Sequence, residues 1–172
     1  MLTPRRNTVA FIALLVAAAA TANAENRVNA KLIADVQTAA PGEPFRAGVL
    51  FRIPDRSHIY WRNPGDSGLP TDVQWTMPDG IEAGVLHWPN PKQFTVQGLD
   101  DVNFGYEHEI LLFSTVTANA DRDSLTLNAT AAWLICLDDG ECIPEQAELT
   151  LEIPVASESK PSEHYDRFEA HA

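Results

Sequence analysis

The sequence predicts an all-β protein, an immunoglobulin-like antiparallel β-sandwich, from three observations. Apolar and polar residues alternate in several segments, no segment keeps a helical period over any length, and turns rich in Gly, Pro, Asn and Asp separate the segments. Half-buried strands of this kind pack as two antiparallel sheets around one core.

The first 24 residues have the pattern of an export signal rather than of a strand. Arg5 and Arg6 supply the positive start, and residues 9–20 form an apolar run too short to span a bilayer. Small residues up to Ala24 fit the cleavage rule. We therefore expect a signal peptide over residues 1–24, and export to an oxidising compartment where a disulfide persists.

The remainder is long enough for one domain, which we place at residues 25–156, followed by a polar tail or linker at residues 157–172. The chain of 172 residues carries a formal net charge of −12, and the signal removes basic residues only. This acidic balance argues against nucleic acid or an anionic membrane surface as a partner. We expect no membrane insertion after signal cleavage.

The expected strands follow one another along the chain. The first two are joined by the turn Pro41-Gly42-Glu43-Pro44 and form a half-buried antiparallel pair, and three more strands follow later. Their apolar positions recur with period two: Val28, Ala30, Leu32, Ala34 and Val36; Phe45, Ala47, Val49, Phe51 and Ile53; residues 111–116; Leu125, Leu127, Ala129, Ala131, Trp133 and Ile135; and Ala147, Leu149, Leu151, Ile153 and Val155.

Tryptophan, tyrosine and proline are concentrated between these strands, at residues 58–70, 75, 88–91 and 104–107. Such residues serve as a sugar platform, a protein-binding patch or packing under loops, and packing is the favoured interpretation.

The only two cysteines, Cys136 and Cys142, have five residues between them, with the strong hairpin-turn dipeptide Asp139-Gly140 in the middle. A hairpin there brings the two Cα atoms within disulfide reach. In the chain-entropy model so short a loop stabilises by only about 2.4 kcal/mol, against roughly 4.7 kcal/mol for a hundred-residue loop. Spacing alone leaves both a structural and a reactive disulfide open.

Two features bear on the reactivity of these cysteines. The apolar residues of the strand before Cys136 occupy odd positions, so Cys136 is expected to point away from the main core unless a bulge intervenes. Asp138, Asp139 and Glu141 disfavour a thiolate, so we expect a guarded thiol unless Arg62 or a backbone donor approaches.

Four motifs, in order along the chain, carry a family resemblance. They are His58-Ile59-Tyr60-Trp61-Arg62-Asn63-Pro64-Gly65-Asp66-Ser67-Gly68-Leu69-Pro70, Trp88-Pro89, Gly105-Tyr106-Glu107, and Trp133-Leu134-Ile135-Cys136 through Cys142-Ile143-Pro144-Glu145. Together they resemble the N-terminal periplasmic domain of the DsbD/ScsB thiol:disulfide interchange proteins, over residues 28–155.

The resemblance implies an immunoglobulin-like sandwich in the periplasm that relays electrons through thiol–disulfide exchange. Electrons would come from a membrane-embedded thiol reductase domain or protein and pass to oxidised periplasmic proteins of thioredoxin fold. By position, Cys142 matches the cysteine that forms the mixed disulfide and Cys136 the one that resolves it. Asp101, Phe104 and Tyr106 match a loop that caps the sulfurs, with Phe104 as the cap itself.

Large members of this family continue into a membrane domain and a thioredoxin-like domain, and the 172 residues contain neither. Separate proteins would then supply the electrons, or the sequence is a piece of a longer chain.

Two other functions remain open. The first is a non-enzymatic binding module in which Cys136 and Cys142 form a structural rivet. The second is copper or zinc handling, prompted by five scattered histidines and by the copper-tolerance association of part of the resembling family, although no zinc-finger spacing is present. No cofactor is expected, and no hydrolase motif is present.

Overall fold

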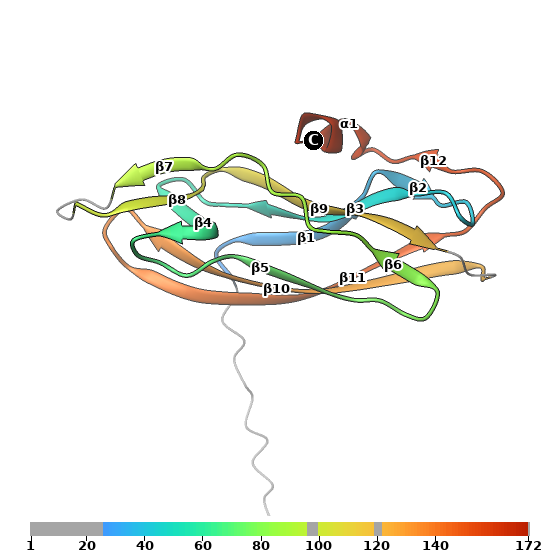
Figure 1. The fold of residues 1–172 in the computed structure, drawn as a ribbon, viewed down its shortest axis with the longest axis horizontal. Coiled ribbons are helices and arrows are strands. Elements are labelled where there is room, and N and C mark those ends of the chain that lie inside the picture. The colour runs from blue at the N-terminus through green and yellow to red at the C-terminus, as the bar shows by residue number, and fades with distance from the viewer. Residues whose placement is uncertain (1–25, 96–99, 119–121, 172) are drawn as a thin grey trace, which may run out of the picture.

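The computed structural model describes residues 26–95, 100–118 and 122–171, and these form a β-sandwich (Figure 1). The elements are β1 (Asn29–Ala34), β2 (Val36–Thr38), β3 (Phe45–Arg52), β4 (Ser57–Gly65), β5 (Asp72–Thr76), β6 (Ile81–Ala83), β7 (Lys92–Thr95), β8 (Val102–Tyr106), β9 (Glu109–Ala118), β10 (Ser124–Leu137), β11 (Cys142–Pro154), β12 (Lys160–Pro161) and α1 (Tyr165–Ala170). The expected signal peptide lies outside the described residues.

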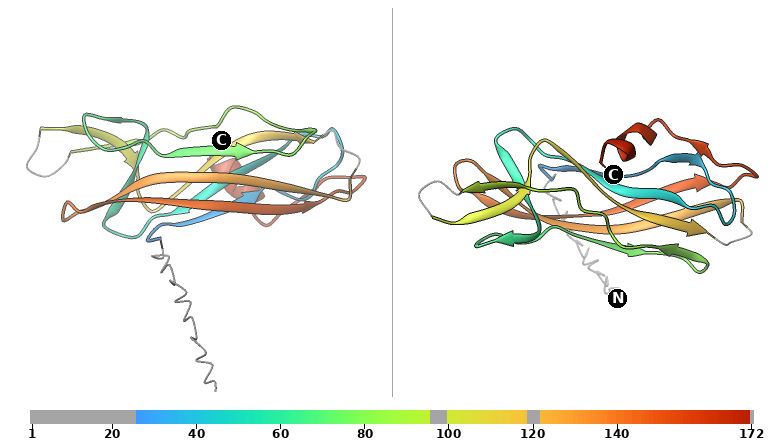
Figure 2. Two further views of the ribbon diagram at one scale, coloured as in Figure 1. Left: turned by 90° about the horizontal axis from the view of Figure 1, so that it is seen from below. Right: turned by 45° about the horizontal axis from the view of Figure 1, so that its top comes forward.

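Two antiparallel sheets make up the sandwich. The first has the strand order β1-β3-β9-β6, and the second has the order β11-β10-β4-β8-β7, with β5 also paired to β10. The β10–β11 hairpin runs the length of the molecule in both views of Figure 2 (orange). Because β10 is long, β4 and β5 share its other edge, β4 at residues 135–137 and β5 at residues 128–132.

The core lies between the two sheets and follows the predicted alternation. The odd-numbered residues of β10 from Leu125 to Ile135 are all buried. Phe51 of the first sheet meets Trp133 of the second edge to face, with ring centroids 5.3 Å apart. The prediction of an all-β, immunoglobulin-like sandwich is confirmed.

The C-terminal segment differs from the expected tail. β12 pairs with β2, and Figure 1 shows α1 and β12 together at one border of the molecule, next to β2. Phe168 of α1 is completely buried and forms a second, smaller core on the outer face of the first sheet; its partners are Ile33, Leu50, Leu111 and Phe113. The physical reason is that these four strand residues are apolar on the face turned away from the main core, and Phe168 removes them from water.

Within the described residues, no helix has the length and apolar character needed to cross a membrane.

Candidate functional site

The two cysteines lie opposite each other where the β10–β11 hairpin ends. Cys136 and Cys142 are the last cross-strand pair of its register, and a disulfide joins them, with the Cα atoms 4.1 Å apart. In the turn between them, Gly140 takes a left-handed φ of 92° and its N–H donates to the carbonyl of Leu137 at 2.9 Å. Glycine adopts this conformation without steric cost, so the Asp-Gly dipeptide builds the turn that closes the disulfide.

The two sulfur-bearing residues differ in exposure. Cys136 is only 3% exposed, whereas Cys142 is exposed. Cys136 does lie on the outer side of its strand, because the next residue back, Ile135, is the one buried in the core. Other side chains on that outer side cover it. An incoming thiol therefore meets Cys142 first.

Tyr60 of β4 is in direct contact with the buried cysteine. Its hydroxyl lies 3.3 Å from Sγ of Cys136, and because a disulfide sulfur carries no hydrogen, the hydroxyl donates. Burial raises the pKa of Tyr60, which keeps that hydroxyl protonated. A donor fixed at this sulfur would stabilise a thiolate there after reduction of the disulfide.

The proline-rich motif after Tyr60 holds the tyrosine ring in place. Gly68 has a φ of 92°, and a Cβ at this position would collide with the ring of Tyr60. The loop is tied to β8: the carboxylate of Asp66 accepts from the N–H of Val102 at 2.8 Å, and Asn103, fully buried, accepts from the N–H of Ser67 at 3.0 Å. This part of the aromatic region therefore serves as packing around the cysteine site.

His58 is a second neighbour of Cys136, and it is its cross-strand partner on β4. The imidazole lies edge to face against Tyr60, with ring centroids 5.1 Å apart, and 4.3 Å from the ring of Phe94 on β7. Burial lowers the pKa of His58, and the charges of Glu107 and Asp138 oppose that shift.

Sequence analysis missed both His58 and Phe94 as site residues. The motif beginning at His58 was a signal for the first, but Phe94 stands in a short strand without a motif.

Of the three expected cap residues, Phe104 and Tyr106 lie in β8 and Asp101 directly precedes it. Phe104 contacts Trp61, with ring centroids 6.4 Å apart. Tyr106 is buried and donates to the carbonyl of Pro89 at 2.7 Å, and burial raises its pKa against the opposing charge of Arg62. Asp101 is half-buried just before β8. A capping role for these residues stays a prediction, and Phe94 is the ring that the structure places against His58.

Two arginines partly offset the negative charge of the acidic residues around the turn. Asp138 pairs with Arg56 at 3.3 Å, and Glu141 pairs with Arg27 at 3.1 Å. Both pairs are exposed, where such contacts contribute about 0–1 kcal/mol. Arg62 lies over the ring of Trp61 at 5.2 Å.

The five histidines are dispersed over the fold. Apart from His58, the ring of His87 lies against Phe113, and His108, His164 and His171 contact Asp55, Glu163 and the carbonyl of Arg167 respectively. Across residues 26–95, 100–118 and 122–171, no group of three or more metal-ligating side chains comes together.

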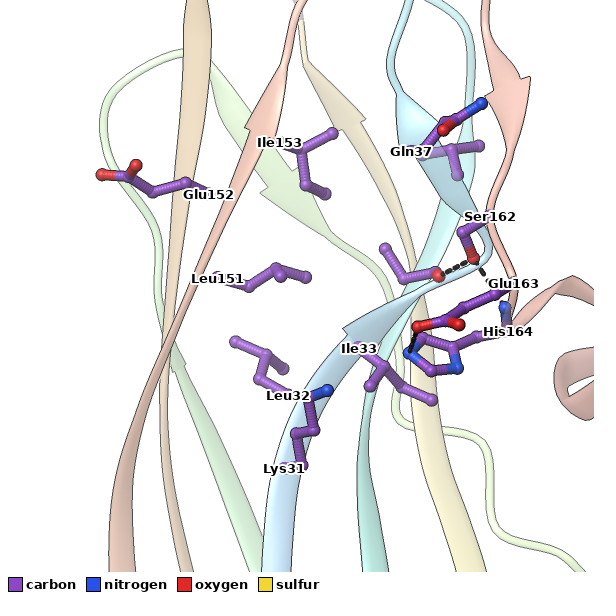
Figure 3. Close-up of a pocket in the computed structure, with 12 residues that line it drawn as sticks. Lys31, Leu32, Ile33, Gln37, Leu151, Glu152, Ile153, Ser162, Glu163 and His164 are labelled. Carbon is purple, nitrogen blue, oxygen red and sulfur yellow. Dashed lines mark hydrogen bonds and ion pairs between the residues drawn. The ribbon is translucent and has the colours of Figure 1, made fainter.

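A pocket of about 450 Å³ lies far from the cysteines, between β1, β11 and the C-terminal segment (Figure 3). The hydroxyl of Ser162 donates to the carbonyl of Ala34 at 2.6 Å and accepts from the N–H of His164 at 3.0 Å. Leu151 is the residue of β11 that lines this pocket nearest to Cys142, and it is about 30 Å along the strand from that cysteine. This pocket takes no part in chemistry at the disulfide.

Comparison with known proteins adds a family to this geometry. The family model described as "Thiol:disulfide interchange protein DsbD, N-terminal" matches residues 27–154, and no curated protein sequence matches. The N-terminal periplasmic domain of ScsB from Proteus mirabilis is similar in structure, with a TM-score of 0.57 and 20% identity over 86% of this chain. This chain spans 55% of that ScsB structure.

Two further solved structures have lower TM-scores. The N-terminal domain of Neisseria meningitidis DsbD in the reduced form gives a TM-score of 0.41 and 15% identity, over 76% of this chain and 90% of that one. A non-cellulosomal cohesin from Archaeoglobus fulgidus gives 0.43 and 13%, over 83% of this chain and 99% of that one. The family model covers most of the chain and both cysteines, so the predicted resemblance is confirmed: this chain belongs to the family of DsbD N-terminal domains of thiol:disulfide interchange proteins.

Proposed function

We propose that this chain is a periplasmic electron-relay domain in which Cys136 and Cys142 alternate between disulfide and dithiol. Electrons enter from a membrane-embedded thiol reductase and leave to oxidised proteins of thioredoxin fold. One observation carries the proposal: a disulfide at a hairpin tip joins an exposed cysteine to a cysteine that is buried against a tyrosine hydroxyl. Exchange needs one sulfur that a partner can reach, and the exposed residue Cys142 meets that need.

The two cysteines have different tasks in this relay. In the dithiol form, the Cys142 thiolate attacks the partner's disulfide, a mixed disulfide forms, and one partner sulfur leaves as a thiolate. Cys136 then attacks Sγ of Cys142, which re-forms the Cys136–Cys142 bond and releases the second partner sulfur. Two electrons have passed to the partner. The burial of Cys136 restricts it to this internal second attack.

Aromatic rings cover the resting disulfide on the side of Cys136, the buried cysteine. Tyr60 contacts Cys136, and the rings of His58 and Phe94 pack against Tyr60. Phe104 and Tyr106 lie in the adjacent strand β8. Cys142 is exposed already, and a partner that displaces Phe94 would also gain access to the side of Cys136, so we assign the cap to β7, with Phe94 as its main ring.

The equilibrium redox potential of the disulfide tests this function, read by thiol alkylation in a series of dithiol buffers. We expect a potential well above about −300 mV, the upper bound of typical structural disulfides. Cys136→Ala should trap a mixed disulfide with an oxidised thioredoxin-fold protein, and Cys142→Ala should form none.

A disulfide that resists reduction until the domain unfolds would contradict the relay. It would favour the non-enzymatic binding module, in which the disulfide is structural.

A further inference from the structure

Three residues with ionisable or redox-active side chains stand in one row across the second sheet. Cys142 on β11 is paired with Cys136 on β10, and Cys136 is paired with His58 on β4. Side chains directly opposite each other on one face have Cβ atoms about 4.5–5.5 Å apart. The register therefore places the side chain of His58 beside that of Cys136, on the side away from Cys142.

The imidazole is enclosed by aromatic rings and has an unused nitrogen. Tyr60 and Phe94 pack against it, and its Nε2 atom is buried with no hydrogen-bond partner among the described residues. An unpaired buried polar atom is unfavourable, so a native structure that keeps one calls for an explanation. One explanation is that Nε2 of His58 gains a hydrogen-bond partner only during the reaction.

Two carboxylates act on His58, and each has a basic partner. Glu107 follows β8 and is paired with Lys92 of β7 at 2.9 Å, and Asp138 of the hairpin turn is paired with Arg56. Burial outweighs the two carboxylates and lowers the pKa of His58, so the ring is neutral near pH 7. Tyr60, the other neighbour of the sulfur, has a raised pKa and serves as a donor only.

We propose that His58 accepts the proton of Cys136 when this thiol attacks the mixed disulfide held on Cys142. The proposal rests on the proposed function and deepens it. The proton moves from Sγ of Cys136 to the imidazole, and the Cys136 thiolate attacks Sγ of Cys142. The Cys136–Cys142 bond forms while the bond from Cys142 to the partner sulfur breaks. The leaving sulfur takes the electron pair and then the proton from the imidazolium, so His58 ends the cycle neutral.

The test uses the reduced chain and the chromogenic disulfide dithiobis(nitrobenzoic acid). The exposed Cys142 attacks the reagent and releases a first equivalent of coloured thiolate, and Cys136 then displaces a second. The two phases report the two attacks separately, and each is followed from about pH 5 to about pH 9, which brackets the titration of histidine and cysteine.

His58→Phe keeps an aromatic ring against Phe94 and Tyr60 but cannot take a proton, and His58→Gln is the second variant should the phenylalanine not fold. We expect the second phase to slow by about tenfold or more near pH 7, at the low end of what a positioned base contributes. The wild-type rate should level off above the pKa of His58, whereas the variant rate should keep rising with pH. The first phase should not change.

His87→Phe is the matched control, because His87 also lies against an aromatic ring, Phe113, at 4.7 Å but away from the cysteines. It should behave as the wild type does in both phases. A second phase with the same pH profile in the wild type and in His58→Phe would overturn this inference and leave the relay intact. A wild-type chain that shows neither phase would overturn the proposed function, and this inference with it.

Discussion

Both outer faces of the sandwich carry apolar side chains that need a cover, and the chain covers the two faces differently. On the first sheet, Phe168 is fully buried, and ion pairs from Arg46 to Glu169 and from Arg167 to Glu109 fix its helix. On the second sheet, Phe94 is only half-buried and lies against His58 through ring contact. The first cover is fully buried, whereas the second is half-exposed and packs against His58 and Tyr60, the two neighbours of Cys136.

The largest effect is expected from removing the first cover. Phe168→Ala exposes four apolar strand residues and should lower the free energy of unfolding by about 3–5 kcal/mol, as for other buried aromatic residues. The redox potential of the disulfide should stay the same. Urea denaturation measures the first quantity and thiol alkylation the second.

Tyr165→Ala is the control on the same helix, because Tyr165 is 43% exposed and should cost far less. Equal stability of Phe168→Ala and the wild type would show that α1 is not part of the folded domain in solution.

A smaller effect is expected at the two glycines that share a φ of 92°, Gly68 and Gly140. At Gly140 a Cβ meets nothing within 4 Å, so Gly140→Ala should cost only the left-handed strain, about 1–2 kcal/mol. At Gly68 the Cβ collides with the ring of Tyr60, so Gly68→Ala should cost about 2–4 kcal/mol in all. Urea denaturation of both variants measures the difference. Equal costs would mean that Gly68 does not position Tyr60.

The two covers also show where sequence analysis succeeds and where it stops. The strand from Leu125 to Ile135 and the Asp-Gly turn could be predicted because their signals are local: period-two burial and a turn dipeptide. Neither Phe94 nor Phe168 could be placed, because each covers residues far away in the chain from a short segment without periodicity. Residues 111–113 are apolar without interruption, which departs from the alternation expected for residues 111–116 and indicates a strand that is covered on both faces.

Phe94 and Phe104 are two rings of the same hairpin, and comparing them tests which one guards the disulfide. Phe94→Ala removes the ring against His58 and Tyr60 and should speed reduction of the Cys136–Cys142 bond by a small dithiol severalfold, because the ring restricts access to the bond from the side of Cys136. Its cost in unfolding free energy should be about 2 kcal/mol for a half-buried aromatic ring. Phe104→Ala, which loses contact with Trp61, should leave the reduction rate unchanged. A faster reduction in Phe104→Ala alone would restore Phe104 as the cap.

The smallest effect is a pH dependence shared by the two faces. Burial is the largest cause of the lowered pKa of both His58, on the second sheet, and His164, in the segment that covers the first. The unfolded chain binds protons at these positions at a higher pH than the folded chain does. The free energy of unfolding should therefore fall as the pH drops from about 6.5, the ordinary value of histidine, towards the lowered values.

Urea denaturation between about pH 7.5 and about pH 5 measures this loss, and His58→Gln and His164→Gln should each remove the part that belongs to one face. Glu107 contributes mainly at lower pH: its pKa is lowered from 4.5, chiefly by its hydrogen bond from Lys92, so the stability that it contributes is lost as the pH falls through 4.5 towards the lowered value. A stability that stays flat in this window would show that neither imidazole is desolvated. A loss that only His58→Gln removes would assign the acid sensitivity to the second sheet, where His58 is the cross-strand partner of Cys136.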